Sequence, residues 1–401
     1  NYLTFALDAK SNDTTIKSVY LYLKDNNSED FEVYNLLRNS GDNFSKTLPA
    51  VDLYNKSSYT YYFAISDGYQ QITTPVSTVN NEKPVSTGDQ INISEGAIIN
   101  QTEQIIGTAN NLIIDDQDVT DKAVKSINGN ARIVFDTTQT DVFFKNAVAI
   151  GNDVIGVFNE GTYSDWRTYA YDINASCFDS DSKTITIAFH AGNKANALEH
   201  NVENNDDFTI KNIRLTLPDG TTLRAGQYSA VYGLGAVEHT EDNWKPDSPV
   251  EVNDITPEKE ISMGDGTSKV EILYATFTLD DQNFNALRYD LDTTALEDGT
   301  HSVTSGSKTV SFVSDNTAPV IETNMVEGQI YHNGTIEGSA QDAICDTSTL
   351  IAALDGEGIE LPYDFRSLEM EPGNHQLVLT ASDMIGNVTS KVINFVTPEE
   401  N

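Results

Sequence analysis

The sequence predicts an all-β chain of small sandwich modules arranged in series. The segment Leu296–Val303 reads apolar-Glu-x-Gly-x-His-x-apolar, and Met370–Leu377 repeats this pattern. In each copy a glycine-centred turn leads into alternating apolar and polar residues, as in a strand with one buried face. A second β-rich stretch follows each copy, at Lys308–Val313 and Lys391–Val396, so each repeat is a hairpin. Hairpins spaced this regularly predict tandem β-sandwiches, which usually display or bind rather than catalyse.

The N-terminal part predicts a first sandwich module over residues 1–79. Val19–Leu23 alternates as a half-buried strand does. Phe63–Gly68 and Leu379–Met384 both run from a strand through Ser-Asp into a turn, which is typical of the closing hairpin of a sandwich. Residues 80–100 are polar and contain proline and glycine, so we expect a linker or edge strands of the next unit.

The middle of the chain predicts a larger module over residues 101–245. Expected strands such as Val142–Phe144 and Thr184–Phe189 are more widely spaced, and about eight strands favour a jelly roll. Three prolines among acidic residues indicate a second linker. The expected C-terminal organisation is a linker over 246–258, a module over 259–316 and a module over 317–401, with the joint between these modules at Asp315–Pro319.

The charge excludes two classes of partner. The chain has 61 acidic and 24 basic residues and a net charge of −37, and nucleic acid or an anionic membrane would repel such a surface. Two cysteines, Cys177 and Cys345, give no disulfide framework, and their scarcity in an extracellular type of array favours a bacterial source. No apolar run approaches the about 18 residues that span a bilayer. Because no signal peptide begins at Asn1, we expect a mature or excised segment.

Short motifs in the C-terminal half resemble a known family. Asp315–Pro319, the two Gly-x-His turns and Ala381–Asn387 resemble the immunoglobulin-like modules of Gram-positive multidomain surface and secreted proteins. Such modules are often appended to glycoside hydrolases or metallophosphoesterases, so the resemblance implies an extracellular or wall-attached location. Asn204–Leu215 is similar to the closing strand of jelly-roll carbohydrate-binding modules, in which an acidic or amide residue often helps to hold a structural calcium.

Calcium is the cofactor that the acidic composition favours, because it takes about six to eight oxygen ligands. The predicted ligands in the middle module are Glu203, Asn205, Asp206 and Asp207. Other candidate groups are Asp115 with Asp116 and Asp118, Asp179 with Asp181, and the Asp315–Asn316 joint. The competing interpretation is an ordinary turn at each of these places, since a chain this acidic produces Asp/Asn turns by chance.

Aromatic side chains predict a sugar-binding surface in the middle module. Exposed rings provide flat apolar platforms for sugars. The densest aromatic group contains Tyr163, Trp166 and Tyr169, and Trp166 follows a loop-like stretch that favours exposure. Tyr169 and Tyr171 share one face of a strand, so a place in the core is the alternative for both.

The sequence predicts no enzyme. Gly373-Asn374-His375 matches a short metallophosphoesterase motif, but it lies inside the repeated turn, and no Asp-x-His element occurs to bind a first metal. The other histidines lack zinc spacing, and the nucleophile elbow and phosphate loop are absent.

The predicted function is therefore a non-catalytic accessory region of a secreted or cell-surface bacterial protein. It would bind a glycan or a host or cell surface, in the manner of an adhesion module, and space a neighbouring domain of a larger polypeptide. Two alternatives stay open at this point. One is a fragment of an extracellular phosphoesterase or glycosidase whose active domain lies outside this chain, and the other is a purely structural stalk.

Overall fold

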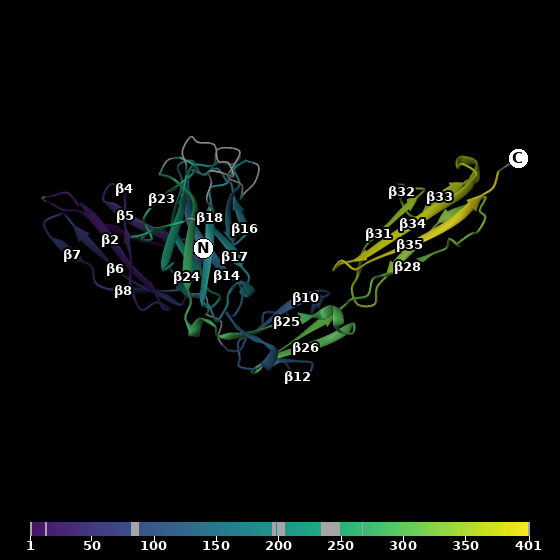
Figure 1. Ribbon diagram of the computed structural model, residues 1–401, viewed down its shortest axis with the longest axis horizontal. Coiled ribbons are helices and arrows are strands. Elements are labelled where there is room, and N and C mark those ends of the chain that lie inside the picture. Colours follow the sequence, from purple (N-terminus) through teal and green to yellow (C-terminus); the bar gives the residue numbers. More distant parts are fainter. Residues whose placement is uncertain are drawn as a thin grey trace. The chain divides into compact units, whose positions relative to one another are not determined.

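The fold is all-β, as the sequence predicts. The computed structural model describes residues 2–12, 14–81, 88–194, 198, 205–233, 249–266 and 268–399. Across these residues the chain forms strands and short 3-10 turns, without an α-helix (Figure 1). No helix in the described part of the chain is long and apolar enough to cross a membrane. The 3-10 turns are η1 Ala50–Leu53, η2 Thr120–Lys122, η3 Ala175–Cys177, η4 Asp281–Asn283, η5 Thr293–Ala295 and η6 Ser367–Glu369.

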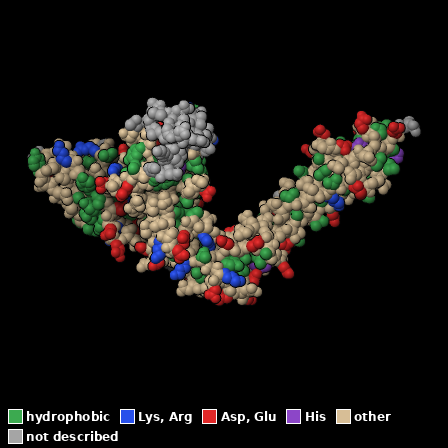
Figure 2. All heavy atoms as spheres, viewed as in Figure 1, with side chains coloured by type: hydrophobic (Ala, Val, Ile, Leu, Met, Phe, Trp, Pro, Cys, Tyr) green, Lys and Arg blue, Asp and Glu red, His purple; other side chains and the backbone are tan. Residues whose placement is uncertain are grey.

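The chain divides into two compact units. The first contains Asn1–Gly88 and Lys125–Ala286, and the second contains Asp89–Val124 and Leu287–Asn401. The second unit is thus interrupted in sequence by part of the first. Acidic side chains are scattered over the face seen in Figure 2.

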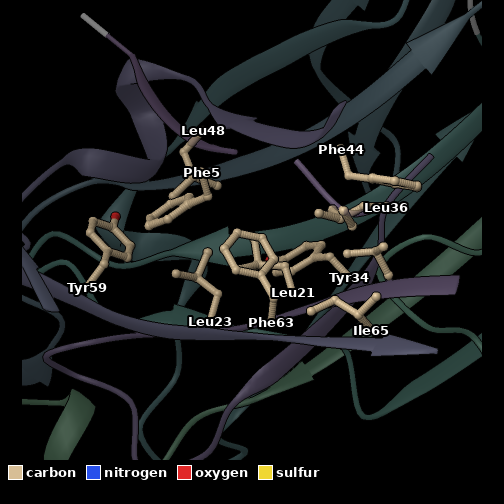
Figure 3. Close-up of a cluster of buried hydrophobic side chains, with 12 residues drawn as sticks. Phe5, Leu21, Leu23, Tyr34, Leu36, Phe44, Leu48, Tyr59, Phe63 and Ile65 are labelled. Atoms are coloured by element: carbon tan, nitrogen blue, oxygen red, sulfur yellow. The ribbon is translucent and has the colours of Figure 1, made fainter. Parts of the chain in front are cut away.

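The N-terminal module is a sandwich of two small sheets. Its core side chains lie between them, with Phe5, Phe44 and Leu48 from one sheet and Leu21 and Phe63 from the other (Figure 3). One sheet has the order β1-β5-β4, and the other has β3-β2-β6-β7 with β8 also paired to β6. The strands are β1 Leu3–Asp8, β2 Ser18–Asp25, β3 Glu32–Asn35, β4 Arg38–Ser40, β5 Asn43–Leu48, β6 Ser58–Ser66, β7 Gln71–Thr73 and β8 Ser77–Asn80.

The second part of the first unit, here called the inserted sandwich, forms in its described residues one 11-stranded sheet folded onto itself. Along the sheet the order is β16-β15-β18-β24-β23-β19-β14-β17, yet Phe135 of β14 and Phe189 of β18 meet edge to face at 5.0 Å. Only a sheet that closes over a shared core brings these strands together. The strands are β14 Ala131–Thr138, β15 Asn146–Ile150, β16 Asp153–Phe158, β17 Arg167–Ile173, β18 Thr184–His190, β19 Phe208–Thr216, β20 Thr222–Leu223, β21 Gln227–Tyr232, β22 Val250–Val252, β23 Ile261–Met263 and β24 Val270–Thr278.

The second unit contains the two modules that carry the repeat. The order β12-β11-β26-β27 in one matches β32-β31-β34-β35 in the other. The first of them has β9 Ala97–Ile99, β10 Thr102–Gly107, β11 Ile113–Ile114, β12 Gln117–Asp118, β25 Ala286–Asp292, β26 Gly299–Ser305 and β27 Lys308–Ser314, with β13 Val124–Ser126 at its edge. The last module has β28 Val320–Thr323, β29 Asn333–Ile336, β30 Gly338–Gln341, β31 Thr347–Leu354, β32 Glu357–Ile359, β33 Tyr363–Arg366, β34 Gly373–Asp383 and β35 Val388–Thr397.

The structure divides the chain differently from the expected boundaries, because the inserted sandwich interrupts a repeat module. β11 pairs with β26, so part of the segment expected in the 101–245 jelly roll belongs with the module expected over 259–316. β24 pairs with β18 and β21, so it belongs to the inserted sandwich. The expected 246–258 linker holds β22, which pairs with β21, while residues 246–248 lie outside the described residues.

Candidate functional site

The repeated turn is held by the same pair of side chains in both copies. Nδ1 of His301 lies 2.6 Å from Oδ2 of Asp115, and Nδ1 of His375 lies 2.6 Å from Oδ2 of Asp355. In each copy the backbone N–H after the histidine donates to the other carboxylate oxygen at 2.8 Å. Both aspartates have a positive φ, 47° and 54°, at the tip of a hairpin. These contacts give each histidine a structural role within the turn.

The rings of these histidines also pack against the core. His301 stacks at 5.4 Å on Phe312, and His375 lies 5.4 Å from Phe395. Burial disfavours the charged form of His301, but hydrogen bonds to the Glu297 carbonyl and to Asp115 outweigh it and raise the pKa of His301. The Asp–His separation is 20 residues in the last module and 186 in the other. The inserted sandwich accounts for the difference, and this separation is the signal that locates the insertion.

The predicted calcium ligands in the middle of the chain have separate partners. Glu203 lies outside the described residues. Asp206 is buried, and its Oδ2 accepts from Nδ2 of Asn146 at 2.6 Å and from the N–H of Asp141 at 3.0 Å. Burial raises the pKa of Asp206. The Asn205 amide donates to the Ala191 carbonyl at 2.6 Å, whereas the exposed Asp207 pairs with Lys269 at 2.5 Å. Asn205 and Asp206 thus hold loops together, and calcium binding at this place stays a prediction.

The other predicted acidic groups lie in turns. Asp115 bonds His301, and Asp118 accepts from the N–H of Thr120 at 2.9 Å, while Asp116 is exposed. Asp179 accepts from the N–H of Asp181 at 2.9 Å. Within the described ranges, one group of three acidic, histidine or cysteine side chains has the spacing of a metal site, and it lies at the Asp315 joint.

The three predicted sugar-binding aromatics have different surroundings. Tyr163 is 69% exposed on the connection between β16 and β17. Trp166 is 39% exposed, and Nζ of Lys211 lies 4.0 Å from its ring centroid, so a cation already occupies one face. Tyr169 lies 5.8 Å from the ring of Phe135 in the core. Tyr169 is half-buried, and its ring packs against this core side chain.

Val142 lies near Tyr163 and is followed in the chain by the exposed Phe143, and the sequence analysis missed both of these apolar side chains. Phe143 is 71% exposed and Val142 is 43% exposed, in a turn where a strand was expected. A Cβ placed on Gly161 would lie 3.0 Å from both the Tyr163 ring and Cγ1 of Val142, so these side chains meet over that glycine. We call Val142, Phe143 and Tyr163 the loop patch. The signal in the sequence that could have indicated this patch is the short apolar run Val142–Phe144.

Hydrogen bonds lock together the two loops that carry the loop patch. The N–H of Thr140 donates to Oγ1 of Thr162 at 3.0 Å, and the N–H of Thr162 donates to the Thr140 carbonyl at 3.1 Å. Oγ1 of Thr140 also donates to the Glu160 carbonyl at 2.6 Å. Both threonines are buried. The patch is thus presented on a fixed base, which reduces the ordering entropy that binding costs.

An ionic seam joins the N-terminal module to the inserted sandwich, with one buried and one half-buried ion pair. Arg214 of β19 makes two hydrogen bonds to Asp52 of η1, at 2.6 and 2.7 Å, and lies 3.8 Å from Asp136. Arg224 makes the same kind of pair with Glu32, at 2.6 and 2.9 Å. Burial opposes ionisation of Glu32, but the hydrogen bond and charge of Arg224 outweigh it and lower the pKa of Glu32 to about 2.

Comparison with known proteins gives one extended relative. No family model matches the chain. It is 29% identical over 388 residues to the uncharacterized protein YvnB of Bacillus subtilis (strain 168), which covers 93% of this chain and 28% of that protein. The chain therefore spans less than a third of the length of this relative.

Solved structures of tandem modules show a weak likeness. Fibronectin(III)-like modules of Clostridium thermocellum CbhA have a TM-score of 0.21 at 11% identity, over 78% of this chain and 98% of that one. The chicken CNTN1 FN1–FN3 domains have a TM-score of 0.19 at 9% identity, over 99% and 94%. Scores this far below 0.5 establish no common arrangement.

Proposed function

We propose that this chain is a non-catalytic accessory region of a secreted or cell-surface bacterial protein. It presents the loop patch to a glycan or another cell-surface ligand and spaces the neighbouring domains. The observation that carries the proposal is the pair of exposed rings, Phe143 at 71% and Tyr163 at 69%, on loops locked by buried threonines. Rings held in this way offer apolar faces to the C–H groups of a sugar at a low entropic cost.

The surface charge narrows the kind of ligand. With a net charge of −37, the chain would be repelled by polyanions. A neutral or cationic polysaccharide avoids this repulsion. The proposed ligand is therefore an uncharged or amino-bearing surface glycan.

The test is binding of the full chain to a glycan array and to isolated Gram-positive cell walls. We expect Tyr163→Ala and Phe143→Ala each to weaken binding by about 10-fold, which is ~1.4 kcal/mol. Tyr69→Ala is the matched control, since Tyr69 is 88% exposed in the N-terminal module. Equal affinities for Tyr163→Ala and Tyr69→Ala would refute the loop patch. No binding to any surface would favour a stalk.

Trp166 belongs in the same experiment. Because Lys211 covers one face of its ring, we expect Trp166→Ala to weaken binding less than Tyr163→Ala does. If Trp166→Ala weakens binding more than Tyr163→Ala does, the binding site is centred on Trp166, as the sequence alone suggested.

A hydrolase fragment remains the second candidate. It is favoured by the share of the Bacillus relative, 28%, that this chain covers, which leaves room for a catalytic domain elsewhere. We expect the chain itself to show no phosphoesterase or glycosidase turnover with added divalent metals. Turnover lost on altering an Asp or His of the inserted sandwich would overturn this expectation.

A further inference from the structure

Three buried metal-ligating side chains meet at the joint between the last two modules. Asp315 follows β27, Cys345 precedes β31 and Asp383 ends β34. They are 1%, 2% and 3% exposed. One ligand atom from each, a carboxylate oxygen or the sulfur, lies within 4.8 Å of the other two. Three separate segments thus bring two carboxylates and a thiol into one small volume.

One oxygen in this group lacks a protein partner. Oδ2 of Asp315 is buried and accepts no hydrogen bond, while its Oδ1 accepts from the N–H of Thr317 at 3.4 Å. Burying an unpaired carboxylate oxygen is costly unless a cation or donor satisfies it. This unsatisfied oxygen leaves a place for a cation or a hydrogen-bond donor.

The surroundings hold the ligands in place as an outer shell does around a metal. Oδ1 of Asp383 accepts from three successive N–H groups, those of residues 385–387, at 2.7–3.0 Å. Nδ2 of Asn387 donates to Oδ2 of Asp383 and to the Asp315 carbonyl, at 2.7 and 2.9 Å. The N–H of Cys345 donates to Asp342 at 3.0 Å. Hydrogen bonds of this kind orient ligating groups around a metal ion.

We propose that Asp315, Cys345 and Asp383 bind a divalent ion of the zinc class, which fastens the last module to the one before it. Calcium takes oxygen ligands, whereas zinc accepts thiolate and carboxylate together. The thiol among the ligands therefore favours zinc at this joint over the calcium that the sequence suggested. Three protein ligands leave a fourth tetrahedral position for water or a further carboxylate.

The test uses the full chain, stripped with chelator and titrated with Zn²⁺, Co²⁺ and Ca²⁺. We expect one equivalent of Co²⁺ to give a tetrahedral spectrum with a thiolate-to-cobalt charge-transfer band. Zn²⁺ should displace the Co²⁺ and raise the melting temperature. Cys345→Ser should remove the band and weaken Zn²⁺ binding at least 100-fold, and Asp315→Asn at least 10-fold.

The second cysteine provides the control. Cys177 is exposed in the inserted sandwich, so Cys177→Ser should leave the cobalt spectrum and the zinc affinity unchanged. Asp315→Asn keeps the shape of the side chain, so it still tests the site if Cys345→Ser misfolds. The proposal is overturned by a cobalt spectrum without a thiolate band, by zinc binding that survives Cys345→Ser, by binding of Ca²⁺ alone, or by no binding.

Discussion

The ionic seam allows a quantitative prediction about how the N-terminal module is attached. Asp52→Asn keeps the size of the side chain but removes the charge that Arg214 meets at 2.6 and 2.7 Å. The Arg214 and Asp52 side chains are only 3% and 10% exposed. The substitution therefore leaves an arginine buried against a neutral amide that can offer it only one acceptor.

The expected cost follows from the burial of this pair. Removing one partner of a buried ion pair costs roughly 3–5 kcal/mol, because the remaining charge stays desolvated. Asp136, at 3.8 Å, still gives Arg214 a counter-charge, which places the expected cost at the lower end, about 3 kcal/mol. For a unit of this size, such a loss lowers the melting temperature by roughly 6–12 °C.

Calorimetry of the full chain measures this shift as the lowering of one of its transitions. Asp281→Asn is the matched control, since it removes a charge from a pair with Lys183 whose aspartate side chain is 85% exposed, and we expect no measurable shift. Replacing both Arg214 and Asp52 by apolar residues should recover stability relative to Asp52→Asn. If Asp52→Asn and Asp281→Asn have the same melting temperature, the ionic seam does not hold the N-terminal module and the reasoning is refuted.

Two further predictions concern acid and the repeated turn. Because the folded pKa of Glu32 lies near 2, below its ordinary 4.5, its contribution is present above about pH 4.5 and is lost as the pH falls towards 2. Between pH 7 and pH 2.5 the melting temperature should therefore decrease less with falling pH for Glu32→Gln than for the native chain. Equal decreases in the two proteins would contradict this. His375→Ala should lower the free energy of unfolding of the last module by about 2 kcal/mol, since it removes a buried ring and leaves Asp355 without its side-chain partner. Urea unfolding of the last module measures this loss. An unchanged urea midpoint would count against a structural role for this histidine.

The strands of the repeat modules were predictable because their signals are local. β34 has alternating burial over most of its length, with apolar residues at most of the buried positions, and its Gly-x-His start recurs in β26. Period-2 alternation and a glycine turn need only neighbouring residues, so they can be read without knowing the partner strand. The structural role of His375 could be inferred in the same way, from the second copy of its turn.

The insertion could not be predicted from such local signals. The hairpin that contains Asp115 lies 186 residues before His301. Neither segment contains a sequence pattern that identifies the other as its partner. The same hairpin is plain in the last module only because Asp355 stands 20 residues from His375. Local sequence patterns do not show which distant segments pair. Such a pairing becomes apparent only when the strands of the two repeat modules are compared one by one.

The loop patch was not predicted from the sequence for a different reason. Val142–Phe144 has the composition of a strand, but the N–H of Asp141 donates to Asp206, which fixes this segment as a turn. Tertiary hydrogen bonds thus override β propensity here, and the aromatic ring of Phe143 is left in solvent. Asp206 was expected as a metal ligand, and the hydrogen bonds that it accepts from Asp141 and Asn146 account for its burial equally well.

The ligand specificity that we propose lies in the inserted sandwich. In the repeat modules the conspicuous polar side chains are used by the fold, as Asp115 and His301 show by bonding each other. The inserted sandwich instead leaves two rings exposed on loops whose backbone is fixed. Its site of insertion corresponds to the short connection between β32 and β33 in the last module, where the repeat tolerates a change of loop length without losing a strand. A repeated frame with one inserted unit can therefore acquire a new binding surface while the turns that hold its hairpins stay unchanged.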